Sequence, residues 1–281
     1  MAEAAEKVYT SRLAPPKTSS HVPLAERVRY YLPTAAIFVG VLGLWELLVR
    51  LFGIKQFILP APSEILNSFT ASFAQMVNLG IYTGVEALGG FILGCGLGIT
   101  VALATARWST ARETLVPFAI AANSVPIIAF SPIMNNWFGS DNQVSKMAIV
   151  GVITFFPMMI NVTRGLTLVD PSALELMRAY AASEMEILRH VRIPNSLPYM
   201  FNAFKICSTL SLIGAVVGEF FGGTRDMLGV YITQEAAQFR FQNSWAAIII
   251  ACLLGITAYL IIVALERMVL PWHASVRKVE E

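Results

Sequence analysis

Charged side chains are scarce in this sequence. Asp, Glu, Lys and Arg make up 14% of the 281 residues, whereas about 25% is usual for a soluble protein. Hydrophobic residues make up 56% of the chain. The shortage of charge excludes an ordinary soluble domain and places most of the chain in a membrane. The formal net charge is only +2, so no overall basic field predicts binding to nucleic acid.

Side chains that bind metals or form disulfides are also few. The sequence has three Cys and three His. The Cys residues lie inside apolar runs without a CxxC spacing, so we interpret them as small packing residues. The His residues lie apart, outside those runs, and we therefore expect neither a metal site nor a cofactor. These six residues are Cys95, Cys207, Cys252, His21, His190 and His273.

Long apolar runs fill the rest of the chain. A helix needs about 20 apolar residues to cross a membrane, and six runs are long enough. They are 31–52, 79–106, 113–138, 144–166, 197–221 and 244–270. The sequence therefore predicts an all-α polytopic membrane protein with six transmembrane helices. The membrane domain covers 31–270, between polar tails at 1–30 and 271–281.

The distribution of Lys and Arg predicts the direction of these spans. With the N-terminus inside, the inner segments hold 14 of the 20 basic residues, and Lys205 lies near the inner end of the fifth span. The outer segments hold Arg50, Lys55, Lys146, Arg225 and Arg240. Because cytoplasmic loops carry the excess of Lys and Arg, we expect both termini in the cytoplasm.

Glycines are dense in the second span, where small residues let helix backbones approach closely. They are Gly84, Gly89, Gly90, Gly94, Gly96 and Gly98. The stretch "GCGLG" within them does not predict a nucleotide site, because neither a preceding strand nor a following Gly-Lys-Ser/Thr accompanies it. We expect this chain not to hydrolyse ATP by itself.

One charged stretch, "ELMRAYAASEMEILRHVRIPNSLP" at 175–198, interrupts the apolar pattern. Asp170-Pro171 predicts a helix start, with Ser172 and Glu175 as an alternative capping box. This helix should end near Tyr180. Ser183 and Glu186 predict a second capping box.

Pro194 and Pro198 should end the second helix of this stretch. The result is a hairpin of two short amphipathic helices on the cytoplasmic side. Such a hairpin could lie on the membrane, insert into a groove on a partner or be an ordinary solvated loop. Two separate caps favour a fixed shape, and hence a partner.

The hairpin resembles the EAA motif of bacterial ABC-importer permeases. That pattern is Glu-Ala-Ala, three residues, Gly, nine residues, Ile, one residue and Leu-Pro. This chain has Glu175-Leu176-Met177, then Ala181, Val191 and Ile193-Pro194, with matching spacing. It departs from the pattern at Ala-Ala, at Gly and at Leu. Ala181 in place of Gly weakens the expectation of a left-handed turn there, because a positive φ costs Ala free energy.

The resemblance covers nearly the whole membrane part. "ILPAPSEI" (58–65), "PIIAFSPIMNNWFG" (126–139), "FFPMMINVTRGL" (155–166) and "GAVVGEFFGG" (214–223) resemble, in order, segments of nitrate/sulfonate/taurine-type permeases. The segment "SPIMNNWFG" is most similar to the corresponding segment of permeases for riboflavin or thiamine precursors. The chain is thus identified as a member of the type I ABC importer permeases of the bacterial inner membrane.

The resemblance implies partners and a role for the loop at 167–196. In that family the loop is a coupling helix that sits in a cleft of an ATPase subunit. The expected partners are two ABC ATPase subunits, a second permease copy that forms a homodimer, an extracytoplasmic solute-binding protein and membrane lipid, but not nucleic acid. ATP hydrolysis belongs to the partner, so the chain is not an enzyme. The residues expected near the ATPase contact are Glu175, Met177, Ala181, Ser183, Arg189 and Pro194.

Polar and aromatic residues within the spans are candidates for the solute path, because polar groups at membrane depth are functional by default. Prolines at 126 and 132 interrupt the third span and can free backbone groups to line a cavity. The candidates are Asn123, Ser131, Asn135, Asn136, Trp137, Phe155, Asn161, Ser208 and Glu219. The Ser hydroxyls could instead bond to their own helix, Phe155 could serve packing alone, and Glu219 could be a solvated or dimer-contact carboxylate.

The solute is predicted from what these spans contain. They lack a cluster of Arg or Lys, which a dedicated anion site would favour, and Asn with aromatic rings suits a neutral planar heterocycle. We therefore expect a vitamin-like solute such as riboflavin or a thiamine precursor, with nitrate, taurine or alkylsulfonates as the alternative. A different class, a self-sufficient secondary transporter, would need an ion relay. Only Glu86, Lys205, Glu219 and Glu46 could supply one, and they form no visible chain.

Overall fold

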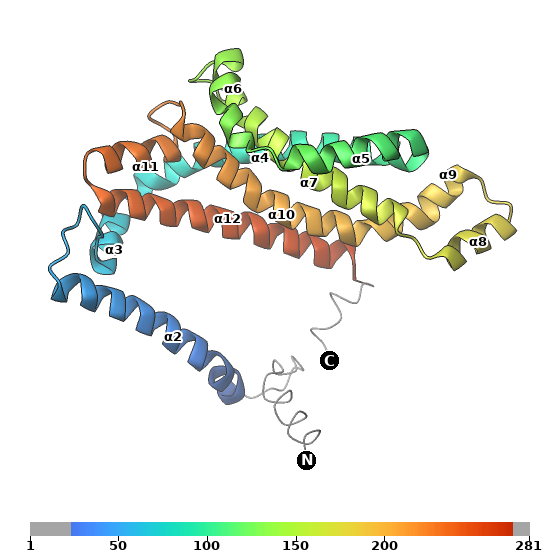
Figure 1. Ribbon diagram of the computed structural model, residues 1–281. Helices are drawn as coiled ribbons and strands as arrows, with labels where there is room; N and C mark the ends of the chain where they lie inside the picture. The colour runs from blue at the N-terminus through green and yellow to red at the C-terminus, as the bar shows by residue number, and fades with distance from the viewer. Residues whose placement is uncertain (1–23, 272–281) are drawn as a thin grey trace.

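The structure is a computed structural model that describes residues 24–271, all of whose regular elements are helices (Figure 1). Most of the two predicted tails lies outside this range, although residues 24–30 form the start of the first described helix. The elements are α2 (Leu24–Leu51), α3 (Pro62–Ala71), α4 (Phe73–Arg107), α5 (Ser109–Asn123), the 3₁₀ turn η1 (Ile127–Phe130), α6 (Ser131–Phe138), α7 (Gln143–Thr167), α8 (Pro171–Ala179), α9 (Glu184–Ile187), the π-helical turn η2 (Leu188–Arg192), α10 (Ile193–Phe220), α11 (Leu228–Ala237) and α12 (Phe241–Val269).

Five helical stretches in the described part are long and apolar enough to cross a membrane. They are Leu32–Leu51, Phe73–Arg107, Gln143–Thr167, Glu184–Phe220 and Phe241–Val269. They correspond to five of the six predicted spans. The chain is therefore an all-helical polytopic membrane protein with five candidate spans.

The third predicted transmembrane helix, 113–138, is not among these five stretches, and its prolines interrupt it as the sequence predicts. The chain forms α5, then η1 and then α6 across this range. Pro126 lacks the N–H that would continue α5, and it pushes the residue before it out of the helical region. Pro132 lies in the first turn of α6, where a proline is tolerated. The prolines therefore divide this segment into two shorter helices.

The centre of the bundle is α7, which packs against both α4 and α10 (Figure 1). Gly90, Gly94 and Gly98 make the contact of α4 with α7 close. A Cβ on Gly94 would lie 2.1 Å from Thr154 Oγ1 and 2.2 Å from Gly151 O. The predicted packing role of the glycines is confirmed for these three, whereas Gly84 and Gly96 have open space around a built Cβ.

Buried side chains of α4, α7 and α10 fill the space among these three helices. The cluster contains Cys95, Ala102, Met158, Val162, Leu166, Ala203 and Cys207. Two of the three cysteines are thus packing residues, as predicted, while Cys252 is exposed on α12. An ion pair adds to this packing, because Lys205 Nζ on α10 lies 3.0 Å from Glu266 Oε2 on α12.

The bundle has two different ends. At one end, α3, α11 and the start of α12 pack against α4 around Ile65, Leu228 and Ile250. The start of α12 also anchors α2, because the rings of Trp45 and Trp245 meet edge to face with centroids 5.5 Å apart. At the other end, α8 and α9 project from α7 and α10 (Figure 1).

Candidate coupling hairpin and solute groove

The first helix of the hairpin begins where the sequence predicts. Asp170 Oδ1 accepts a hydrogen bond of 2.8 Å from the Ser172 backbone N–H, and Pro171 is the first residue of α8. The alternative start at Ser172 is wrong, because Ser172 lies inside α8. Asp170 is favoured over Ser172 as the N-cap because its carboxylate also interacts with the positive end of the helix dipole.

The turn after α8 is left-handed although it lacks glycine. Ala181 has a φ of 53°, so the weakened expectation of a left-handed turn is corrected. The Ala181 N–H donates to Arg178 O at 2.9 Å, and the Ala182 N–H donates to Met177 O at 3.0 Å. This pair of bonds is a Schellman motif, which satisfies the last carbonyls of α8. The motif holds Ala181 in a conformation that Ala otherwise avoids.

The second capping box is confirmed. The Ser183 N–H donates to Glu186 Oε2 at 2.7 Å, and the Glu186 N–H donates to Ser183 Oγ at 3.3 Å. Both bonds join residues three positions apart, so the chain makes them without help from the rest of the fold. They fix the direction in which α9 leaves the turn.

The prediction that Pro194 and Pro198 end the second helix is wrong. Helical backbone runs without a break from Glu184 to Phe220 through α9, η2 and α10. In η2 the Ile193 N–H donates to Leu188 O, five residues back, and Pro194 takes the first turn of α10, where its missing N–H costs little. The second helix of the hairpin, α9, is therefore one end of a long helix that extends into the membrane part.

The base of the hairpin is tied to the bundle. Asn195 Nδ2 donates to Gly165 O at 2.7 Å and to Leu168 O at 2.9 Å, which joins α10 to the end of α7. Ile187 is buried. Displacement of α9 should therefore move the C-terminal end of α7 and the N-terminal end of α10 with it.

The tip of the hairpin exposes apolar side chains that the sequence analysis missed. Leu176, Tyr180 and Met185 are 57%, 78% and 65% exposed. Leu176 and Tyr180 are four positions apart on a helical pattern, so the i, i+4 spacing could have shown that they share a face. Exposed apolar groups next to charged ones are typical of a protein contact surface.

The six residues predicted for the ATPase contact gather in the same region. Glu175, Ala181, Ser183, Arg189 and Pro194 are exposed, and Met177 is half-buried. The structure thus places them on or beside the projecting hairpin, and their contact with an ATPase remains a prediction.

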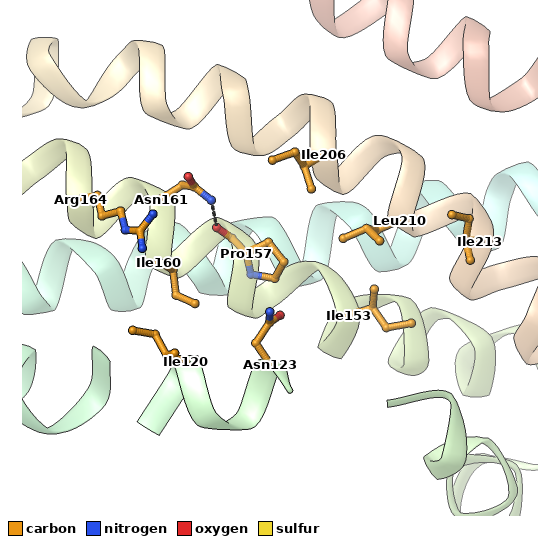
Figure 2. Close-up of a pocket in the computed structure, with 10 residues that line it drawn as sticks. All are labelled: Ile120, Asn123, Ile153, Pro157, Ile160, Asn161, Arg164, Ile206, Leu210 and Ile213. Atoms are coloured by element: carbon orange, nitrogen blue, oxygen red, sulfur yellow. Dashed lines mark hydrogen bonds between the residues drawn. The ribbon is translucent and has the colours of Figure 1, made fainter. Parts of the chain in front are cut away.

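A groove with a volume of about 610 Å³ lies along α5, α7 and α10 (Figure 2). Its polar lining consists of Asn123 from α5 and of Asn161 and Arg164 from α7. Seven apolar residues complete it: Ile120, Ile153, Pro157, Ile160, Ile206, Leu210 and Ile213. Asn161 Nδ2 donates to Pro157 O at 2.8 Å, which leaves its carbonyl oxygen available to a ligand.

Of the nine candidates for the solute path, the structure brings Asn123 and Asn161 together in this groove. It adds Arg164, which the sequence analysis counted only among the inner basic residues. Asn161 and Arg164 are three positions apart on α7, and this i, i+3 spacing could have shown that they share a face of the helix.

The other candidates lie elsewhere. Asn135 Nδ2 donates to Phe221 O at 3.1 Å, Ser208 Oγ donates to its own helix at Lys205 O, and Phe155 packs on Phe156. Ser131 is buried, while Asn136 and Trp137 are exposed on α6. Glu219 is also buried, so its alternative as a solvated carboxylate is wrong.

The residues proposed for an ion relay divide among separate partners. Glu46 bonds to Ser63 and Arg50, Lys205 pairs with Glu266, and Glu86 lies near Glu219 and Lys146. This division does not favour a relay along the spans.

A bundle of apolar helices, a solute-sized groove along it and a projecting charged hairpin define an integral membrane transport component. The chain belongs to the family of binding-protein-dependent transport system inner membrane components, whose family model matches residues 94–271. It is therefore a multi-pass inner-membrane permease subunit of a binding-protein-dependent ABC importer, and it is not catalytic itself. Membership implies ATPase and binding-protein partners.

Curated relatives cover most of the chain. The formylaminopyrimidine transport permease protein of Halalkalibacterium halodurans is 29% identical over 84% of this chain and 94% of its own length. The riboflavin transport system permease protein of Chloroflexus aurantiacus is 29% identical over 82% of this chain and 86% of its own. A putative aliphatic sulfonates transport permease protein of Bacillus subtilis is 28% identical over 84% and 85%.

Proposed function

We propose that this permease passes a vitamin-like heterocycle, such as riboflavin or a thiamine precursor, through the groove along α5, α7 and α10. It acts as a homodimer with two ATPase subunits and an extracytoplasmic binding protein. The α8–α9 hairpin faces the cytoplasm and docks on the ATPase. Both chain termini lie on that side.

The continuity of helix from Glu184 to Phe220 carries this proposal. The hairpin end of this helix exposes the contact surface around Met185, and further along the same helix Ile206, Leu210 and Ile213 line the groove. Because a helix transmits displacement along its axis, movement of the hairpin by an ATPase shifts one wall of the groove. ATP-driven closure is thereby coupled to access.

The groove chemistry supports a planar, amide-bearing solute. Asn123 and Asn161 offer amide groups that can pair with ring carbonyl and N–H edges, and the surrounding Ile and Leu side chains match the faces of a ring. Two of the relatives are named for formylaminopyrimidine and riboflavin. The residues of the groove and the names of these relatives together support a heterocyclic solute.

Arg164 favours a second candidate, an anionic solute such as an alkylsulfonate, taurine or nitrate. A guanidinium binds sulfonate or nitrate oxygens in a bidentate manner, and one relative is named for aliphatic sulfonates. A single Arg also pairs with a ring carbonyl, so the two candidates differ in how strongly they depend on its charge.

Substitution of Glu175 by Lys tests the coupling. We expect Glu175→Lys to abolish solute uptake in proteoliposomes that contain the whole importer, while the protein remains folded and inserted. Glu113→Lys, at an exposed position of α5, is the matched control and should transport normally. Normal uptake by Glu175→Lys would disprove the assignment of the hairpin.

A ligand panel tests the solute. The reconstituted importer is assayed for ATP hydrolysis with its binding protein loaded with riboflavin, formylaminopyrimidine, taurine, an alkylsulfonate or nitrate. We expect stimulation by a heterocycle and only a moderate loss in Arg164→Gln. Stimulation by an anion, with complete loss in Arg164→Gln, would select the second candidate. Uptake driven by an ion gradient without ATP would select a secondary transporter.

A further inference from the structure

Three ionisable side chains from three helices meet inside the protein, at the end of α10 away from the hairpin. Glu86 from α4, Lys146 from α7 and Glu219 from α10 are 0%, 0% and 1% exposed. Thr83, one helical turn before Glu86 on α4, and Glu219 on α10 both accept hydrogen bonds from the first turn of α11. Lys146 Cγ would lie 3.7 Å from a Cβ on Gly218, the residue next to Glu219. None of the three lines the groove.

Glu219 caps the helix that follows α10. Its Oε2 accepts a hydrogen bond of 2.5 Å from the Gly229 N–H, and Thr83 Oγ1 accepts one of 3.1 Å from the Leu228 N–H. Both donors lie in the first turn of α11. Gly229 permits the close approach, because a Cβ there would lie 2.7 Å from Glu219 Oε2. The start of a helix favours an anion, so Glu219 is the ionised member of the pair.

Three buried carboxyl oxygens in this cluster have no partner among the described residues: both oxygens of Glu86 and Oε1 of Glu219. Ionised carboxylates only accept hydrogen bonds, whereas a protonated carboxyl also donates one. One proton on Glu86 therefore supplies a hydrogen bond from Glu86 to Glu219 Oε1. This bond gives a partner to two of the three oxygens, one on Glu86 and Oε1 of Glu219.

The charge balance requires the same proton. With both carboxylates ionised and Lys146 protonated, the buried cluster would carry one net negative charge, which is costly away from water. Lys146 Nζ also donates to Ser140 O. Asp141, next to Ser140 in the chain, is exposed and is therefore solvated by water. One bound proton makes the buried cluster neutral.

We propose that Glu86 and Glu219 hold one proton between them, carried by Glu86, and that this carboxyl-to-carboxylate hydrogen bond fastens α4 to α10 at the end of the bundle opposite the hairpin. Loss of the proton at alkaline pH places two adjacent negative charges between these helices. The same helices carry the packing that joins the two ends of the molecule. The stability of the contact between α4 and α10 at this end therefore depends on pH.

Infrared spectroscopy of the importer in lipid tests the proton directly. We expect the spectrum at neutral pH to contain the carbonyl-stretch band of a protonated, buried carboxyl. The band should be lost in Glu86→Gln, kept in Glu113→Gln and lost reversibly when the wild-type protein is titrated to alkaline pH. Absence of the band from the wild-type protein overturns the proposal, and so does a band that Glu219→Gln removes and Glu86→Gln keeps.

Thermal unfolding of the same complex gives an independent test. Because the Gln amide donates the same hydrogen bond without a titratable proton, the midpoint of Glu86→Gln should stay level from neutral to alkaline pH, whereas that of the control Glu113→Gln should fall as in the wild-type protein. The wild-type midpoint should fall over that range by more than that of Glu86→Gln. Equal falls overturn the proposal. If Glu86→Gln does not fold, the infrared titration of the wild-type protein decides.

Discussion

The hairpin end of the bundle and the end opposite it both carry charge, but in opposite surroundings. At the hairpin end, Glu175, Glu184 and Arg189 are exposed and need no fixed partner, because water solvates them. At the other end, Glu219 lies with Glu86 and Lys146 away from solvent, where each polar atom must be matched. Charge at the first end is suited to selecting a partner protein, whereas charge at the second end determines how the helices pack.

The tightly packed middle of the bundle joins these two ends. Gly90, Gly94 and Gly98 bring α4 against α7, and α7 packs on α10. A rigid middle lets a displacement at the hairpin reach the far end. Substitutions at the buried end should therefore have larger effects on stability than those at the exposed end, with the middle between them.

The largest effect should come from Lys146→Met. This substitution removes the Lys cation of the buried cluster and leaves the ionised carboxylate of Glu219 uncompensated, which should cost about 3–5 kcal/mol of folding free energy. Thermal unfolding of the permease in lipid measures the loss. Lys55→Met removes an exposed Lys and should change the midpoint little. Equal effects of the two substitutions would contradict the contrast between the ends.

Gly94→Ala should destabilise the middle of the bundle by about 1–3 kcal/mol. The added methyl would lie 2.2 Å from Gly151 O, and backbone must shift to admit it. Gly96→Ala, two residues away in open space, should be neutral or slightly stabilising, because Ala favours helix. The difference in unfolding midpoint between these variants measures the packing alone, and its absence would show that α4 and α7 do not meet as described.

Ser183→Ala should destabilise the start of α9 by about 1 kcal/mol, because it removes the hydrogen bond to the Glu186 N–H. Hydrogen exchange at residues 184–187 should quicken about fivefold as a result. Ser172→Ala is the control, since the Ser172 side chain makes no hydrogen bond to residues 24–271 and Asp170 caps α8. Equal exchange in both variants would show that the capping box does not hold the hairpin.

The smallest effect, of opposite sign, should come from Ala181→Gly. Relief of the positive φ stabilises the turn, and the greater freedom of Gly in the unfolded chain offsets part of the gain, so we expect a net stabilisation of about 0.5 kcal/mol. Ala182→Gly, where φ is not positive, should destabilise instead. Hydrogen exchange of the hairpin distinguishes the two, and a loss in Ala181→Gly would argue against the left-handed turn.

Local features of the hairpin were predictable because the atoms involved are close in sequence. Asp170 and Ser183 cap helices two to three residues away, and Ser183 pairs with Glu186 regardless of what surrounds them. The break in the third span was predicted from Pro126 and Pro132, because a proline interrupts a helix locally. The prediction that Pro194 ends the helix was wrong, because the helix continues past this proline through a π-helical turn, which is rare.

The meeting of distant residues could not be predicted in this way. Asn123 and Arg164 come from different helices and share a groove only because α5 packs against α7. Glu219, predicted as a path residue, instead meets Glu86 across 133 positions of sequence. Nothing in the sequence near either carboxylate indicates the other.

The sequence by itself determined that this chain is an apolar, helical membrane protein with a capped, charged hairpin, because hydropathy, helix caps and proline positions act over a few residues. The tertiary structure alone decided which polar side chains line the groove, which are buried as a cluster and that the hairpin continues into α10. These outcomes depend on how helices pack side by side, and glycines such as Gly94 set that packing through contacts with residues some 60 positions away.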